Sequence, residues 1–278
     1  MLMAANSGDY AKSIEGWRAA YEQGLKAPEG WLSVAGLFWL KEGANRVGSA
    51  EGNAIRLPAR CARELGAFEF RDGRATFRPA AGAPVMVNGK TAGVAELKDD
   101  HGQAPDVVRT GDVSLTVIRR GKRFGIRMRD PRAETVRGFK GGQWYPVNAA
   151  YRVHAVWHAY DASKMVPITN ILGDTEGEPS PGYATFKLNG KEYKLEPVVE
   201  DPGELFFLFR DATSAHETYG AGRFLKAAMP KDGAVELDFN KAYNPPCAYI
   251  AFATCPLPPR QNHLDTRVEA GQKRYESH

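Results

Sequence analysis

The chain has 278 residues, 43% hydrophobic and 25% charged, a composition that is typical of a globular protein and excludes wholesale disorder. Its 37 basic and 33 acidic residues leave a net charge of +4, an excess too small and dispersed to indicate nucleic-acid binding, although it permits an anionic ligand. The longest apolar run, residues 31–40, is far shorter than the ~20 residues that cross a bilayer, and no charged leader precedes an apolar core, so we expect neither a membrane span nor a secretory signal.

The first predicted element is an amphipathic helix. Tyr10, Ile14, Trp17, Tyr21 and Leu25 recur at helical spacing and form an aromatic stripe, which we interpret as a docking face. Residues 30–40 are too rich in glycine and aromatic residues for a helix and are expected to pack against the next part of the chain. Together these residues form a first segment, 1–44.

Alternation of apolar residues with a period of two then indicates β-strands joined by tight turns. The predicted turns lie at residues 72–73, 88–89, 119–123, 189–190 and 231–233. Residues 205–209 are apolar on both faces, which indicates a central strand.

Short strands with turns at this frequency are typical of sandwiches and barrels, not of a βαβ fold. Residues 138–146 contain three glycines and a proline and mark a predicted boundary. We therefore predict a mainly β protein: the N-terminal helix, a β-sandwich over 45–146, and a second antiparallel β-barrel or sandwich over 147–278.

The three cysteines, Cys61, Cys247 and Cys255, form no CxxC pair. The segment between the last two looks extended, and eight residues at ~3.3 Å each would hold the sulfurs more than ~20 Å apart. Only a sharp bend could pair them. We therefore expect reduced thiols and a cytoplasmic location, with Cys247 as a small core residue.

Familiar catalytic and metal-binding motifs are incomplete. His216 begins a zincin-like sequence, but Gly220 stands where the second histidine is required. His154 and His158 would lie ~13 Å apart on an extended strand, too far to share a metal. No GxSxG elbow or P-loop is present. We expect no metal and no cofactor.

Polar residues are concentrated in three short pieces of the second half. The candidate ligand-binding residues are Arg210, Asp211, Thr213, Thr218, Tyr219, Arg223, Asp238, Asn240, Tyr243 and Asn244. Arginines offer fork-shaped donors for a carboxylate or phosphate, and aspartates can orient them or accept protons. The alternative interpretation is that Arg210, Asp211, Asp238 and Asn240 form a buried network that satisfies backbone groups.

Residues 30–40, 210–213, 218–225, 238–248 and 255–259 resemble a bacterial family, the domain-of-unknown-function family 1684. The resemblance runs from about Trp17 to Tyr275, and 238–247 is its most specific part. The family pattern has Gly-Lys in place of Ala215-His216 and a glutamate in place of Gln272, which argues against functional roles for His216 and Gln272. The resemblance implies membership of a family that has no established activity.

Residues 45–49, 53–58 and 87–89 resemble the strand and turn pattern of a forkhead-associated sandwich. That module reads phosphothreonine through an arginine, a serine and an asparagine, for which Arg46, Ser49 and Asn88 are the nearest equivalents. No histidine matches the one that usually braces such a site, so the resemblance implies architecture only.

Three hypotheses remain open. In the first, the C-terminal domain binds a small polar or anionic molecule, with the two arginines clamping an acid group and the aspartates, Asn240 and Tyr243 setting its orientation. In the second, the protein is a hydrolase or lyase with Asp211 or Asp238 as base and Tyr219 or Tyr243 as acid. In the third, the N-terminal sandwich is a peptide-binding module.

Overall fold

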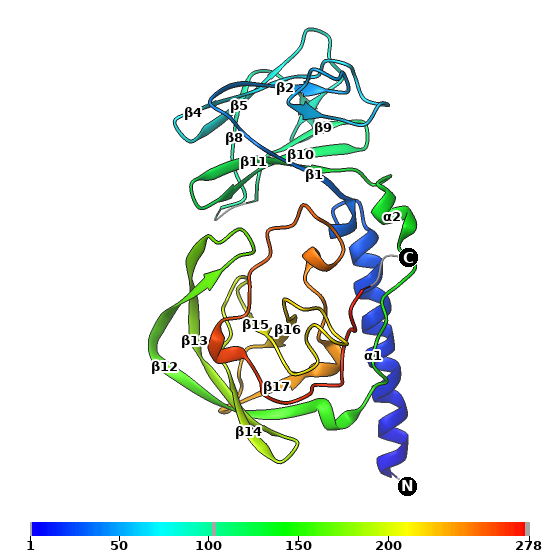
Figure 1. Cartoon of the computed structure of the whole chain (residues 1–278), viewed down its shortest axis with the longest axis vertical. Helices are drawn as coiled ribbons and strands as arrows, with labels where there is room; N and C mark the ends of the chain where they lie inside the picture. The colour runs from blue at the N-terminus through cyan, green and yellow to red at the C-terminus, as the bar shows by residue number, and fades with distance from the viewer. Residues whose placement is uncertain (1, 102–103, 276–278) are drawn as a thin grey trace. The chain divides into compact units, whose positions relative to one another are not determined.

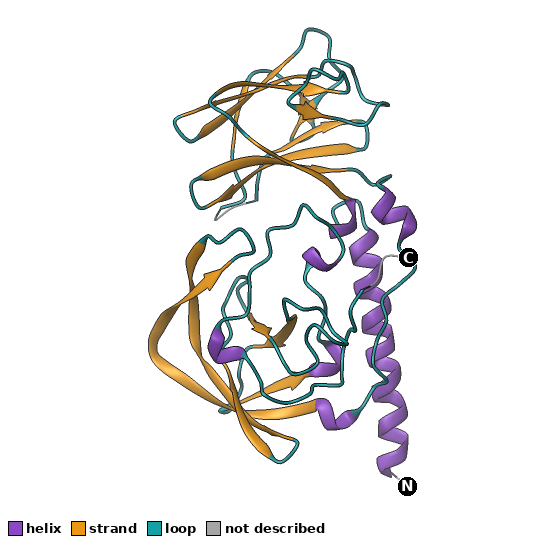
Figure 2. Cartoon of the chain, in the orientation of Figure 1, coloured by secondary structure: helices purple, strands orange, loops and turns teal. Residues whose placement is uncertain are grey.

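The computed structural model describes residues 2–101 and 104–275, and the chain is mainly β (Figures 1 and 2). It forms two compact units. The N-terminal unit is Leu25–Phe139, and the C-terminal unit combines the N-terminal helix up to Gly24 with the chain from Lys140 onward. The sequence-based division near 44 and 146 set the helix apart, whereas the structure groups it with the C-terminal unit.

Helix α1 (Leu2–Lys26) docks through its aromatic stripe, as the spacing predicted. Ile14 is fully buried, and the ring of Trp17 stacks on Tyr21 at 5.6 Å. The helix ends before Pro28, whose ring disfavours helical geometry at the preceding residue. Within the described residues, no helix has the length and apolar character needed to cross a membrane.

The N-terminal unit contains two sheets. The six-stranded sheet has the order β1 (Val34–Trp39), β11 (Arg123–Arg129), β10 (Val113–Arg120), β9 (Val107–Thr110), β6 (Met86–Val87), β7 (Lys90–Thr91). The five-stranded sheet has the order β3 (Ile55–Arg56), β2 (Gly43–Gly48), β4 (Gly66–Arg71), β5 (Arg74–Pro79), β8 (Ala95–Leu97). Only the β2–β3 pair is parallel among the described strand pairs. Phe68 and Phe77 from one sheet and Leu115 and Ile126 from the other share one buried core.

Short helical segments flank these strands: η1 (Trp31–Ser33) precedes β1, and α2 (Glu134–Gly138) follows β11. The predicted turns at 72–73, 88–89 and 119–123 are confirmed, because they join β4 to β5, β6 to β7 and β10 to β11. The likeness to a forkhead-associated sandwich stays a prediction.

The C-terminal unit has a four-stranded antiparallel sheet and a two-stranded ribbon. The sheet has the order β14 (Lys191–Leu195), β13 (Thr175–Leu188), β12 (Arg152–Thr169), β17 (Ala234–Asp238), and β15 (Glu204–Phe209) pairs with β16 (Arg223–Ala228). Residues 205–209 are buried as predicted, but the predicted central strand is wrong: β15 belongs to a two-stranded ribbon with β16 and has only an isolated bridge, Val198 to Phe206, on its other side. None of the described sheets closes into a barrel.

Beyond β17 the chain is largely irregular and covers the core. It contains three short helical turns: η3 (Phe239–Lys241), η4 (Pro246–Ala248) and η5 (Arg260–Asn262). A fourth, η2 (Ala149–Tyr151), precedes β12. Leu264, Val268 and Ala270 from the C-terminal segment pack into the same core as the β15–β16 ribbon. The extended segment expected between Cys247 and Cys255 is wrong, because η4 and a turn occupy that place.

Candidate functional site

Arg223 and Asp211 form a completely buried ion pair, with 3.1 Å between Nη2 and Oδ1. The Arg223 guanidinium also donates to the backbone oxygens of Val268, at 2.9 Å, and Ala270. The other Asp211 oxygen accepts from the backbone N–H of Val268 at 2.8 Å and the hydroxyl of Thr213 at 2.7 Å. Burial lowers the pKa of Arg223, and the Asp211 carboxylate opposes that shift. The pair therefore holds the C-terminal segment on the core and presents no charge to a ligand.

The neighbouring candidates follow the same pattern. Thr213 and Thr218 are fully buried, and their hydroxyls lie 3.0 Å apart. Tyr219 is half-buried, and burial raises the pKa of its phenol. Arg210 is half-buried, and its backbone bridges to the segment that begins at Asn262. These residues close a tight loop before β16.

Asp238 and Asn240 tie helix α1 to the sheet. Asp238 accepts a hydrogen bond from the Tyr10 hydroxyl at 2.8 Å and from the backbone N–H of Asn240 at 3.1 Å. The Asn240 amide donates to the backbone oxygen of Asn148 at 2.9 Å, and Arg18 donates to the backbone oxygen of Asn240 at 3.1 Å. Burial, followed by the Asp238 carboxylate, raises the pKa of Tyr10. The buried-network interpretation therefore describes Asp211, Asp238 and Asn240.

Tyr243 belongs to an aromatic cluster against the helix. Its ring lies 5.0 Å from that of Tyr21 and 5.8 Å from that of Phe224. Burial raises the pKa of the Tyr243 phenol. This tyrosine therefore supports the docking of α1.

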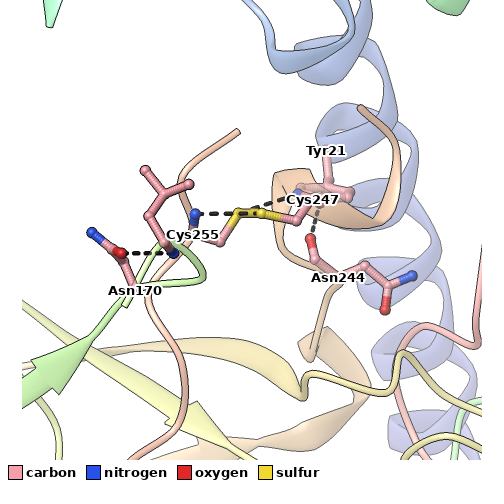
Figure 3. The surroundings of a disulfide bond; sticks show 6 residues. Tyr21, Asn170, Asn244, Cys247 and Cys255 are labelled. Carbon is pink, nitrogen blue, oxygen red and sulfur yellow. Dashed lines mark hydrogen bonds between the residues drawn. A yellow bond between two sulfur atoms is a disulfide. The ribbon is translucent and has the colours of Figure 1, made fainter. Parts of the chain in front are cut away.

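Asn244 pairs with Gln272, and each of these two side chains leaves one polar atom without a hydrogen-bond partner within the described residues, as the buried Nε of Arg223 also does. Gln272 Oε1 accepts from the Asn244 backbone N–H at 2.9 Å and from the Tyr249 hydroxyl at 2.8 Å. The Asn244 amide donates to the backbone oxygen of Lys273 at 2.8 Å, and Tyr21 donates to the backbone oxygen of Asn244 at 3.2 Å (Figure 3). Both amide side chains are fully buried, yet Asn244 Oδ1 and Gln272 Nε2 have no hydrogen-bond partner within the described residues.

An acidic side chain from α1, that of Glu22, lies beside the Gln272 side chain. Glu22 Oε1 accepts from the backbone N–H of Gly142 at 2.9 Å and from Trp144 Nε1 at 2.7 Å. A Cβ on Gly142 would lie 2.3 Å from Gln272 Nε2 and 3.2 Å from Glu22 Oε1. Glycine is therefore required for the Gln272 amide to approach this backbone. We call Tyr21, Glu22, Trp144, Asn244, Tyr249 and Gln272 the Asn244–Gln272 cluster.

A disulfide joins Cys247 to Cys255 beside this cluster, with their Cα atoms 6.2 Å apart (Figure 3). Each backbone N–H also donates to the other residue's sulfur, at 3.1 and 3.3 Å. The prediction of reduced, distant thiols is wrong for these two residues, because η4 and the following turn bend the chain back. Reduced thiols therefore no longer support a cytoplasmic location, since disulfides persist mainly in oxidising compartments. The bent loop also carries Tyr249 to Gln272.

The other chemical candidates from the sequence are engaged elsewhere. The His158 ring stacks on Tyr183 at 4.7 Å, and its Nε2 lies 2.9 Å from the Thr185 hydroxyl. Cys247 is in the disulfide and has no free thiol. In the N-terminal unit, Ser49 donates to the backbone oxygen of Cys61.

The phosphothreonine-type arrangement is likewise not assembled. Arg46 lies within β2 of the five-stranded sheet, whereas Asn88 lies in the β6–β7 turn of the other sheet. Asn88 donates to Asp106 and accepts from the backbone N–H of Val107. These contacts, with that of Ser49, leave the third hypothesis without a binding site.

Comparison with known proteins places the candidate site within a described family. Residues 137–273 match a family model described as a protein of unknown function (DUF1684). Over these residues the chain belongs to the DUF1684 family. The matched region contains every candidate ligand-binding residue and Gln272, but not the helix residues Tyr21 and Glu22.

Among solved structures, the chain is similar to an uncharacterized protein from gene locus rrnAC0354 of Haloarcula marismortui, determined by solution NMR. The two are 30% identical, the match covers 49% of this chain and 77% of that one, and the TM-score is 0.42. No curated protein matches the chain.

Proposed function

We propose that the C-terminal unit binds a small, neutral, polar molecule at the Asn244–Gln272 cluster. The observation that supports this is the pair of fully buried side chains, Asn244 and Gln272, that contact each other and each keep an unpartnered polar atom. Buried polar atoms are hydrogen-bonded in nearly all native proteins, so such orphans indicate a missing partner. One atom is an acceptor and the other a donor, a combination that suits hydroxyl and amide groups.

The surroundings favour a neutral ligand over an anionic one. The Glu22 carboxylate lies beside the Gln272 amide and would repel a second negative charge. Arg223 is fully buried and paired with Asp211, so it cannot serve as an anion clamp. The aromatic rings of Tyr21 and Trp144, 6.0 Å apart, supply an apolar border of the kind that small-molecule sites use.

The geometry favours binding over acid–base catalysis. The Asp211 and Asp238 carboxylates both accept hydrogen bonds from within the protein, and Asp211 is also paired with Arg223. A general base must reach the proton that it removes. The alternative of a hydrolase or lyase that uses these aspartates therefore gains no support.

The test is a thermal-shift screen of the full chain against sugars, polyols, amides, nucleosides and carboxylic acids. We expect a hydroxyl- or amide-bearing compound to raise Tm. Gln272→Glu keeps the oxygen that accepts from Asn244 and Tyr249 but removes the unpartnered donor. The affinity for the compound should therefore fall by about tenfold, because one net hydrogen bond contributes up to about 1.5 kcal/mol.

The matched control is Gln23→Glu, which makes the same chemical change at an exposed position of α1. This variant should bind as the parent chain does. The proposal fails if no compound in the panel raises Tm, or if both variants lose affinity equally.

A further inference from the structure

The six-stranded sheet of the N-terminal unit carries a buried arginine, Arg127, on strand β11, which lies between β1 and β10 (Figure 1). Ile126 and Met128, its neighbours along the strand, belong to the core that the two sheets share, so the Arg127 side chain projects from the opposite face of the sheet. This side chain is only 8% exposed. A charged group that is buried to this extent is normally paired and hydrogen-bonded.

Arg127 lacks hydrogen-bonded partners for much of its guanidinium group. Its Nε and Nη2 atoms are buried and make no hydrogen bond within the described residues. Its Nη1 atom lies 3.8 Å from Asp100 Oδ2, which is beyond hydrogen-bond distance, and the same oxygen lies 2.9 Å from Arg120 Nη2. Burial, followed by the charge of Arg120, lowers the pKa of Arg127 to about 10, so the group still carries its charge at neutral pH.

The two unpartnered atoms of Arg127 lie on one edge of the guanidinium group. Their N–H bonds are parallel, and such a pair of donors matches the two oxygens of a carboxylate or phosphate group. Two other buried arginines, Arg18 and Arg223, leave only Nε unpartnered, because both of their Nη atoms donate to backbone oxygens. These two arginines hold the fold together, whereas Arg127 keeps a whole donor edge unused.

The neighbours of Arg127 are mainly apolar. The guanidinium carbon lies 5.1 Å from the centre of the Trp31 ring. Leu37 of β1 and Thr116 of β10 are directly opposite Arg127 in the sheet, so their side chains project from the same face. Apolar side chains with a small number of polar groups are typical of sites for small organic molecules. The Thr116 hydroxyl can donate one further hydrogen bond.

The charges around Arg127 favour a ligand with a single negative charge. Arg129, two residues along the strand, lies over the same Trp31 ring at 5.5 Å and adds positive charge. The carboxylates of Asp100 and Glu29, at 3.8 Å from Arg127 and Arg129 respectively, would repel a ligand of higher negative charge. A carboxylate carries one negative charge at neutral pH, whereas a phosphate monoester carries about −1.5 to −2.

We propose that the free edge of Arg127 binds the carboxylate of a small organic acid whose apolar body packs against Trp31 and Leu37. Nε and Nη2 each donate to one carboxylate oxygen and so gain the partners that they lack. The site belongs to the N-terminal unit, whereas the Asn244–Gln272 cluster belongs to the C-terminal unit.

The test is isothermal titration calorimetry of the full chain with acetate, hexanoate and benzoate, and with benzamide and inorganic phosphate for comparison. Hexanoate and benzoate should bind more tightly than acetate, because only they bring an apolar body to bury. Benzamide keeps the ring of benzoate without its charge and should bind at least about tenfold more weakly, because hydrogen bonds between charged groups are the stronger ones.

The decisive variant is Arg127→Met, which removes the donors and keeps an unbranched side chain. It should weaken benzoate binding at least about tenfold. It should not lower the Tm of the free chain, because it removes a buried charge that has no hydrogen-bonded partner, and Asp100 keeps Arg120. An arginine with a purely structural role would give the opposite result, a lower Tm with unchanged affinity.

The matched control is Arg78→Met, the same change at an exposed position of β5. It should leave the affinity for benzoate within about twofold of the parent chain, as should Gln272→Glu, which alters only the Asn244–Gln272 cluster.

The proposal is wrong if none of the three carboxylates binds, or if benzamide or inorganic phosphate binds as tightly as benzoate. Equal losses of affinity in Arg127→Met and Arg78→Met would also contradict it, because net charge alone would then explain binding. A loss in Gln272→Glu without a loss in Arg127→Met would place the acid at the Asn244–Gln272 cluster instead.

Discussion

The Arg223–Asp211 pair provides the sharpest test of the structural role assigned to the conspicuous polar residues. In Asp211→Ala the guanidinium loses its anion, and Val268 and Thr213 lose their acceptor. Breaking a buried ion pair from one side costs about 3–5 kcal/mol, because the remaining charge stays buried without a counter-charge. For a unit of this size each kcal/mol lowers Tm by about 2–4 °C, so we expect a fall of roughly 6–20 °C.

The assay is thermal unfolding of the full chain, followed by tryptophan fluorescence. Asp161→Ala removes an exposed aspartate of the same unit and should leave Tm within about 1 °C, since exposed substitutions change stability little. Adding Arg223→Met to Asp211→Ala should recover part of the loss, because the unpaired buried charge is then gone. A cost below about 1 kcal/mol for Asp211→Ala would refute the structural role and return Arg223 to consideration as a ligand clamp.

Three further perturbations test other contacts. Replacing Cys247 and Cys255 by serine should lower the free energy of unfolding by roughly 2.5 kcal/mol, which is the loop-closure value for a disulfide between residues 8 positions apart. A Tm that reductant does not change would contradict the disulfide. Tyr10→Phe removes the hydroxyl that binds Asp238, so we expect a loss of about 1 kcal/mol in urea unfolding, with no change if that bond is absent. Gly222→Ala places a Cβ 2.6 Å from a backbone oxygen at a φ of +103°, so it should lower the free energy of urea unfolding by about 1–3 kcal/mol. The control, Gly16→Ala, changes a helical position with open space around it and should not lower the free energy of unfolding.

Local patterns predicted the strands well, because turn residues and alternation act over a few positions. Asp72-Gly73 and Asn189-Gly190 both join strand pairs as expected. The disulfide was missed because an apolar run between Cys247 and Cys255 was interpreted as extended. Pro246 carried the missed signal, since proline is favoured in the first turn of a helix and η4 begins there.

The composition of the site depended on contacts that sequence spacing does not reveal. Tyr10 and Asp238 are 228 positions apart, and Asn244 and Gln272 are 28 apart, yet each pair is hydrogen-bonded. Sequence reasoning included Asn244 and set Gln272 aside because it departs from the family pattern. The polar stretch of the sequence contains one member of the proposed cluster, Asn244, whereas burial shows which of its other residues stabilise the fold.

The most direct test of ligand binding at the Asn244–Gln272 cluster is a crystal structure of the full chain with the compound that gives the largest thermal shift. We predict electron density for that compound with polar atoms in hydrogen-bond contact with Asn244 Oδ1 and Gln272 Nε2. Density for a single water bridging these atoms, with the compound bound elsewhere, would contradict ligand binding at this cluster.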